Sequence, residues 1–169
     1  YYSSLDGVLF NKDKTILINY PNKKGDYYEI PKSVKTVENL AFCDIYRLKK
    51  VYIPSSVTKL GSFSMLENIE VSKNNAMYSS IDGVLFNREG TEILIYPQKK
   101  TDKIYKIPST TKVINIMAFY NNMKLEELHI PESVVSFSDI MESYAFTWSK
   151  KLKRIDVSDN NKVYMSVDG

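Results

Sequence analysis

Three kinds of residue in this chain could carry chemistry: one cysteine, one histidine and three Asp-Gly pairs. Cys43 and His129 could act as nucleophile and base only if the fold brought them together. They occupy different positions of the sequence repeat, several repeats apart, so we expect no such pair. A zinc site of several cysteines and histidines is excluded by the same counts. We expect Cys43, which follows a buried Phe42, to be a packed or half-exposed structural thiol.

The Asp-Gly pairs are the sharpest polar candidates: Asp6-Gly7, Asp82-Gly83 and Asp168-Gly169. Calcium needs several converging oxygen ligands, and each of these aspartates stands alone within its motif. Aspartate followed by glycine is favourable in a tight turn, because the side chain bonds nearby backbone and glycine accepts positive φ. No acidic pair stands out as catalytic, and six scattered glycines make no phosphate loop. We therefore predict turns here, and no catalytic residue, metal or cofactor.

The composition is that of a folded protein, with 43% apolar and 25% charged residues in 169. A net charge of +3 with interspersed signs gives no concentrated basic face, so we expect no nucleic-acid partner. No stretch approaches the roughly 18 apolar residues of a membrane span. The lysine pairs are interpreted as solvated charges: Lys23-Lys24, Lys49-Lys50, Lys99-Lys100 and Lys150-Lys151.

The structural elements that position these residues belong to a sequence repeat. Residues 2–11 return almost unchanged as residues 78–87, and the same motif begins again at residue 164. Such a chain is built by stacking one unit. We expect one domain over residues 1–169, with coarse units 1–77 and 78–163 and a third beginning at 164, cut from a longer array.

A finer repeat lies inside the coarse one. Ile-Pro pairs occur 23 residues apart, at Ile30-Pro31 and Ile53-Pro54, and again at Ile107-Pro108 and Ile130-Pro131. The segments 48–53, 66–71, 125–130 and 152–157 alternate apolar and polar residues over their last four positions, as strands with one buried face do. A proline ends such a strand, because it cannot donate to the ladder. Twenty-three residues suffice for a strand, a turn and a short helical or 3₁₀ return, which is one coil of a solenoid.

The Asp-Gly-Val-Leu-Phe-Asn segment departs from this pattern. It leads through a short polar turn into a second apolar run, at residues 16–20 or 93–96, and so predicts a β-hairpin. We expect the second arm to join the main sheet, giving about eight parallel ladder strands. The coils from Ile53 to Ile69 (16 residues) and from Ile130 to Ile155 (25 residues) depart from the period. In the longer one, residues 138–143 are either a surface protrusion or a simple length variant.

The pattern Ile-Pro-x-x-Val, Ala-Phe, Leu-x-x-Ile-x-Ile-Pro resembles the BspA-like class of leucine-rich repeat. The Tyr-x-Ser-x-Asp-Gly-Val-Leu-Phe segment followed by Tyr-Pro is typical of the same family, and the resemblance covers essentially all of the chain. It implies an α/β repeat solenoid: a right-handed leucine-rich-repeat stack with a parallel β-sheet on the concave face, short helical or irregular returns, and inserted β-hairpins. Family members are commonly secreted or surface proteins of bacteria, implicated in adhesion and not known for catalysis.

Positions filled alike in both units are interpreted as scaffold, whereas outward positions that differ could carry recognition. We predict binding through Tyr27, Glu29, Lys50, Tyr52, Lys106, Glu127, His129, Arg154 and Asp156, with Asn68, Glu70 and Ile104 on the same face. Any one of them could equally belong to an ordinary solvated sheet face. The resemblance implies a non-catalytic adhesion module, extracellular or on a bacterial surface, whose partner is a protein such as a host extracellular or cell-surface protein. The alternative is a structural spacer or stalk that presents another domain.

Overall fold

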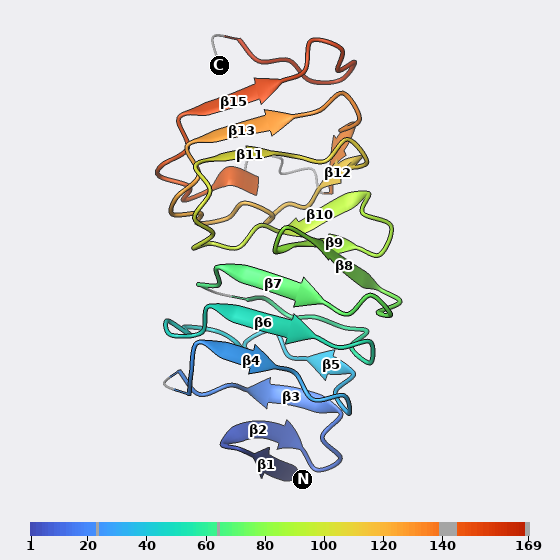
Figure 1. Ribbon diagram of the computed structural model, residues 1–169, viewed down its shortest axis with the longest axis vertical. Helices are drawn as coiled ribbons and strands as arrows, with labels where there is room; N and C mark the ends of the chain where they lie inside the picture. Colours follow the sequence, from blue (N-terminus) through green and yellow to red (C-terminus); the bar gives the residue numbers. More distant parts are fainter. Residues whose placement is uncertain (23, 64, 139–144, 168–169) are drawn as a thin grey trace.

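The chain folds into an elongated β-solenoid whose termini lie at opposite ends of the stack (Figure 1). The computed structural model describes residues 1–22, 24–63, 65–138 and 145–167. Within these ranges the secondary structure is almost entirely strand and turn, with a single 3₁₀ turn at residues 145–146. The stacked coils of the predicted repeat are therefore confirmed.

Six strands form the main ladder, as two separate three-stranded parallel sheets. The first sheet consists of β4 (Tyr27–Glu29), β6 (Lys50–Ile53) and β7 (Asn68–Val71); the second consists of β11 (Ile104–Lys106), β13 (Glu127–Ile130) and β15 (Arg154–Val157). Successive side chains of these strands point alternately into the core and outward. Val51 and Leu128 are fully buried at the centre of their strands, while the residues on either side of each point outward.

The Asp-Gly segments form two antiparallel three-stranded meanders. They consist of β1 (Tyr2–Leu5), β2 (Val8–Asn11) and β3 (Ile16–Asn19), and of β8 (Tyr78–Ile81), β9 (Val84–Asn87) and β10 (Glu92–Ile95). Asp6 and Gly7 have φ of 48° and 78°, and Asp82 and Gly83 have 50° and 78°. Two consecutive residues with positive φ make a type I′ turn, which suits the twist of a hairpin. The predicted Asp-Gly turns are confirmed at both sites, and the third pair lies outside the described residues.

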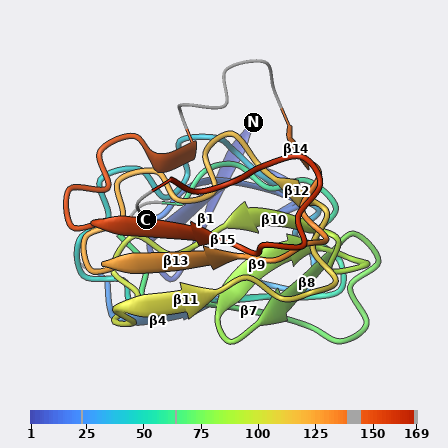
Figure 2. The same cartoon turned by 90° about the horizontal axis from the view of Figure 1, so that it is seen from above.

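The predicted partner of the hairpin's last strand was wrong. β3 and β10 pair in parallel with short return strands, not with the ladder. The return strands are β5 (Thr36–Val37), β12 (Val113–Ile114) and β14 (Ser136–Phe137). Figure 2 shows β12 and β14 on a different side of the stack from the ladder strands β11 and β13. The ladder therefore has six strands instead of about eight.

The second meander also ends the first ladder sheet. The backbone N–H of Ile69 in β7 donates to the carbonyl of Gly83 at 2.9 Å, so the Asp-Gly turn occupies the edge of β7. Gly83 fits closely there, because a Cβ atom would lie 2.4 Å from Nδ2 of Asn68. This contact places the meander between the two ladder sheets, where Figure 1 shows β8, β9 and β10.

Apart from the 3₁₀ turn at residues 145–146, the described parts of the returns consist of short strands, turns and irregular segments. After the Ile-Pro step, Val34 N–H closes a turn on the Pro31 carbonyl, and β5 follows within two residues. Because almost no helix is found, the α/β class and the helical returns are not confirmed. The right-handed sense of the stack and the concave position of the sheet stay predictions. The predicted protrusion falls largely on residues outside the described ranges.

A stack of aromatic rings fills the core of each unit. In the first unit the ring centroids of Tyr20 and Phe42 are 5.5 Å apart, and those of Phe42 and Phe63 are 5.1 Å apart. In the second unit Phe119 stacks on Tyr96 at 5.2 Å and on Phe146 at 5.7 Å. The rings come from successive coils, so their packing helps to hold neighbouring coils in register. Interpreting the shared aromatic positions as scaffold is supported by this packing.

One predicted solvated lysine belongs to this scaffold. The Lys100 side chain is only 12% exposed, lies 3.0 Å from Asp102 Oδ2 and donates to the Asp82 carbonyl at 2.7 Å. Lys24 makes the same contact with the Asp6 carbonyl in the first unit. The lysine after the Tyr-Pro step thus ties down the Asp-Gly turn, and for Lys100 the solvated interpretation was wrong.

We expect the buried tyrosines to make the protein sensitive to alkali. Desolvation raises the pKa of Tyr28, Tyr96 and Tyr105 above the ordinary value of 10.0, with smaller contributions from neighbouring Asp102 to Tyr96 and Asp82 to Tyr105. A tyrosine that stays protonated in the folded state contributes stability that is complete below pH 10.0 and is lost as the pH rises above that value.

The measurement is a titration followed by ultraviolet absorbance and circular dichroism together. Exposed tyrosines should ionise without loss of structure. The buried tyrosines should ionise only at higher pH, together with unfolding. If all tyrosines ionised in one step near pH 10.0 with the circular dichroism unchanged, the buried hydroxyls would not be desolvated as described.

Candidate functional site

The outer face of each ladder sheet carries a two-by-three grid of side chains. The first array consists of Tyr27, Glu29, Lys50, Tyr52, Asn68 and Glu70; the second array consists of Ile104, Lys106, Glu127, His129, Arg154 and Asp156. All twelve are exposed or half-buried. Each row is fixed by strand register, which aligns Glu29, Tyr52 and Glu70 in one array and Lys106, His129 and Asp156 in the other.

The first array is organised around a lysine. Lys50 Nζ lies 2.5 Å from Glu70 Oε1 and 5.9 Å from the ring centroid of Tyr27. Both charged side chains are well exposed, so the ion pair contributes little stability. Desolvation and then the nearby Glu29 carboxylate raise the pKa of Tyr27, whose hydroxyl is therefore a hydrogen-bond donor at neutral pH. A hollow of about 480 Å³ beside the array is lined by Tyr27, Tyr52 and both carboxylates.

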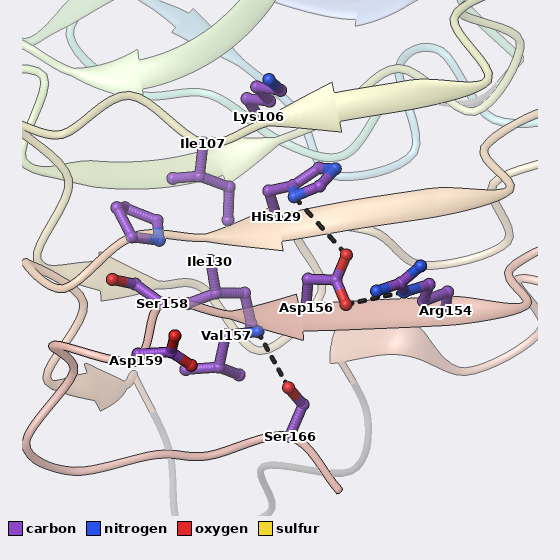
Figure 3. Close-up of a pocket in the computed structure, with 11 residues that line it drawn as sticks. Lys106, Ile107, His129, Ile130, Arg154, Asp156, Val157, Ser158, Asp159 and Ser166 are labelled. Atoms are coloured by element: carbon purple, nitrogen blue, oxygen red, sulfur yellow. Dashed lines mark hydrogen bonds and ion pairs between the residues drawn. The ribbon is translucent and has the colours of Figure 1, made fainter. Parts of the chain in front are cut away.

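The second array holds a continuous chain of charged and titratable groups, and Figure 3 shows the part formed by His129, Asp156 and Arg154. His129 Nε2 lies 2.7 Å from Glu127 Oε1, and His129 Nδ1 lies 3.6 Å from Asp156 Oδ2. The other oxygen of Asp156 accepts from Arg154 Nε at 2.7 Å. Their side chains, apart from that of Arg154, are between 22% and 34% exposed, so they are partly shielded from solvent. A hollow of about 680 Å³ opens beside them, with Lys106 on its rim.

The nine predicted binding residues therefore all lie on one side of the ladder, but in two groups. Four of them fall in the first array and five in the second, and the second meander separates the sheets that carry them. A single continuous strip was expected, and two patches are found. The cause is the edge contact between β7 and Gly83, which the residue pattern of either strand does not reveal.

The predictions missed the loop residues that complete each hollow. Lys32, Ser55 and Asn74 line the first hollow, and Asp159 and Ser166 line the second. They lie in the turns that follow the Ile-Pro steps and the ladder strands. Their shared place in the repeat was a signal that could have found them.

Cys43 does not take the predicted place, because it is exposed. The preceding residue, Phe42, turns inward, and the N–H of Cys43 bonds the Leu40 carbonyl in a turn that directs its side chain outward. His129 lies on the outer face of β13, in the second unit, so the two residues stay in different parts of the stack. The described part of the chain contains no helix with the length and apolar character needed to cross a membrane.

Stacked coils with a parallel ladder, connected by short returns around an apolar core, define a leucine-rich-repeat β-solenoid. The family model described as BspA type leucine rich repeat region matches residues 20–99 and 95–166, in six copies. The chain belongs to this family.

Solved structures with the same fold come from bacterial proteins. The pneumococcal vaccine antigen PcpA is 26% identical over 77% of this chain and 38% of its own, with a TM-score of 0.63. A leucine rich cell surface protein from Faecalibacterium prausnitzii is 30% identical over 74% of this chain and 33% of its own, with a TM-score of 0.61. A leucine-rich repeat protein from Eubacterium ventriosum is 25% identical over 89% and 44%, also with a TM-score of 0.61.

This chain spans less than half the length of each of these three structures. No curated protein sequence matches it. The comparisons therefore establish a family and a fold, and the family suggests a repeat-based binding or adhesion role.

Proposed function

We propose that the chain is a non-catalytic binding module of a bacterial surface or secreted protein, which recognises a protein ligand through the two arrays. The family supports this proposal, since one similar structure is a cell surface protein and another a vaccine antigen. The partner we propose is a host extracellular or cell-surface protein. The two hollows are shallow, lie at equivalent places in the two units, and are where such a partner would dock.

The observation that carries the proposal is where the two units differ. Inward ladder positions keep their character, as with Tyr28 and Tyr105. Outward positions change charge instead: a glutamate at 29 corresponds to a lysine at 106, and a lysine at 50 corresponds to a glutamate at 127. A face needed only for solubility has no requirement for a fixed charge order. Charge reversal on the same frame would let the two units present different charge patterns to a partner.

A spacer or stalk is the second candidate. The elongated stack, with its ends far apart, supports it, because each added coil lengthens the molecule without altering its neighbours (Figure 1). Binding and spacing make opposite predictions for the isolated domain: a binding module retains a partner, and a spacer does not.

The test measures adhesion of the purified domain to immobilised extracellular-matrix proteins and to epithelial cells. We expect saturable binding, and we expect the double substitution Tyr52→Ala with His129→Ala to weaken it at least tenfold, as loss of central aromatic contacts does in other interfaces. Both side chains lie on the outer face, so the variant should remain folded.

A matched control changes two exposed residues of the return side, Lys59→Ala with Lys112→Ala. This control should bind like the unmodified domain. Equal binding by the Tyr52/His129 variant would refute the arrays as the recognition surface, and no binding to any immobilised protein or cell would favour the spacer.

A further inference from the structure

A histidine and two carboxylates meet on the second array. One ligand atom from each of Glu127, His129 and Asp156 lies within 4.8 Å of the others. Imidazole nitrogen and carboxylate oxygen are both good ligands for zinc, which is usually held by four atoms at about 2.0–2.2 Å. In a tetrahedral site such atoms lie about 3.4 Å apart. The three side chains are therefore close enough for side-chain rotations to bring their ligand atoms to this separation.

The ladder fixes this arrangement. Glu127 and His129 are two residues apart on β13, so their side chains leave the same face of the strand. Asp156 on β15 is the direct register partner of His129. All three backbones belong to paired strands instead of loops, which holds a site more firmly.

The surroundings leave room for a cation. Arg154 Nε holds one oxygen of Asp156 at 2.7 Å, which orients the carboxylate and leaves Oδ2 directed at His129 (Figure 3). The Glu127 carboxylate, now 2.7 Å from Nε2, sits on a side chain with three rotatable bonds. The hollow beside His129 and Asp156 gives space for a water as the remaining ligand.

We propose that Glu127, His129 and Asp156 form a zinc-binding site that links β13 to β15. A rotation of the imidazole brings one nitrogen toward both carboxylates and replaces the present contacts with the carboxylates by bonds to the cation. Zinc fits this mixed nitrogen and oxygen set with few ligands, whereas calcium requires six or more oxygens. This zinc site would exist whether or not the same face also binds a protein.

The first array provides an internal comparison. By strand register, Lys50 takes the place of Glu127, Tyr52 that of His129, and Glu70 that of Asp156. Only the last of these is a zinc ligand, so one array should bind the cation and the other should not. Two substitutions, Lys50→Glu and Tyr52→His, should recreate the ligand set there.

The experiment titrates zinc chloride into the purified domain at neutral pH, by calorimetry. We expect one zinc ion per chain, and at least a tenfold loss of affinity in His129→Ala and in Asp156→Asn. The matched control is Glu70→Gln, which should bind zinc like the unmodified domain. Calcium chloride in the same titration should give no specific binding.

Lack of zinc binding, or unchanged affinity in the His129 and Asp156 variants, would overturn the proposal. The double variant of the first array should raise the stoichiometry to two zinc ions per chain. A value that stayed at one would refute the idea that ladder register alone assembles the site. Circular dichroism on each variant should match that of the unmodified domain, since all these side chains lie on the outer face.

Discussion

Replacing Gly61 by alanine is expected to destabilise the domain by about 3 kcal/mol, the upper range for forcing an atom into a packed interior. A Cβ atom at this position would lie 2.3 Å from the Glu38 carbonyl oxygen and 2.5 Å from the Cα atom of Asn39. Both are backbone atoms of the preceding coil, so no side-chain rotation can relieve the contact. The coils must move apart.

The contact follows from the short coil between Ile53 and Ile69. Lys59 pairs with Thr36 and Phe63 with Phe42, so the intervening chain is drawn directly onto the coil below. The second unit has a longer coil and a serine, Ser138, at the position equivalent to Gly61. Glycine is therefore needed where the coil is short.

Urea denaturation followed by circular dichroism gives the measurement. Gly25→Ala is the control, because its new Cβ would lie 3.9 Å from the nearest atoms, which is ordinary contact. That control should change the free energy of unfolding by less than about 1 kcal/mol. Similar midpoints for the two variants would show that the coils are not packed as closely as described.

Asn75→Ala is expected to cost about 3 kcal/mol, because it removes one buried side chain that satisfies four backbone groups. Asn75 is fully buried. Its Nδ2 donates to the carbonyls of Pro54 at 2.8 Å and Val57 at 2.9 Å, and its Oδ1 accepts from the N–H groups of Met77 and Tyr78. The substitution would leave these groups without partners in the interior.

The neighbouring residue is the control. Asn74 is exposed, and Asn74→Ala should leave the free energy of unfolding within about 0.5 kcal/mol of the unmodified value. Asn161 makes the same four bonds in the second unit but is less buried. The loss of unfolding free energy in Asn161→Ala should therefore lie between those of Asn74→Ala and Asn75→Ala. A neutral Asn75→Ala would mean that water replaces the amide and that the site is open to solvent.

The sequence was sufficient to predict features that depend on neighbours along the chain. Alternation identified the ladder strands and their outward residues, and Asp-Gly identified the tight turns. These patterns are local, since side-chain direction in a strand depends only on whether a position is odd or even. The stacking of equivalent coils then followed from the repeat itself.

Features that depend on pairing between coils were not predicted. Whether β3 joins the ladder or the returns is decided by tertiary pairing with β5, and the residues of β3 suit either place. Lys100 was interpreted from its charge, but its carbonyl partner at Asp82 lies 18 residues away. The Glu127, His129 and Asp156 cluster needed the register between two strands, which no single segment contains.

The junction after each ladder sheet is built twice from the same groups. Val71 N–H donates to Ser80 Oγ at 3.0 Å, and Val157 N–H donates to Ser166 Oγ at 3.3 Å. Each junction also has its asparagine, Asn75 or Asn161, anchored to the preceding Ile-Pro turn. The two junctions between coarse units therefore use equivalent bonding groups. Duplication or deletion of a whole unit would leave these junction bonds in place, so an array of such units can change length while each unit keeps its own outer face.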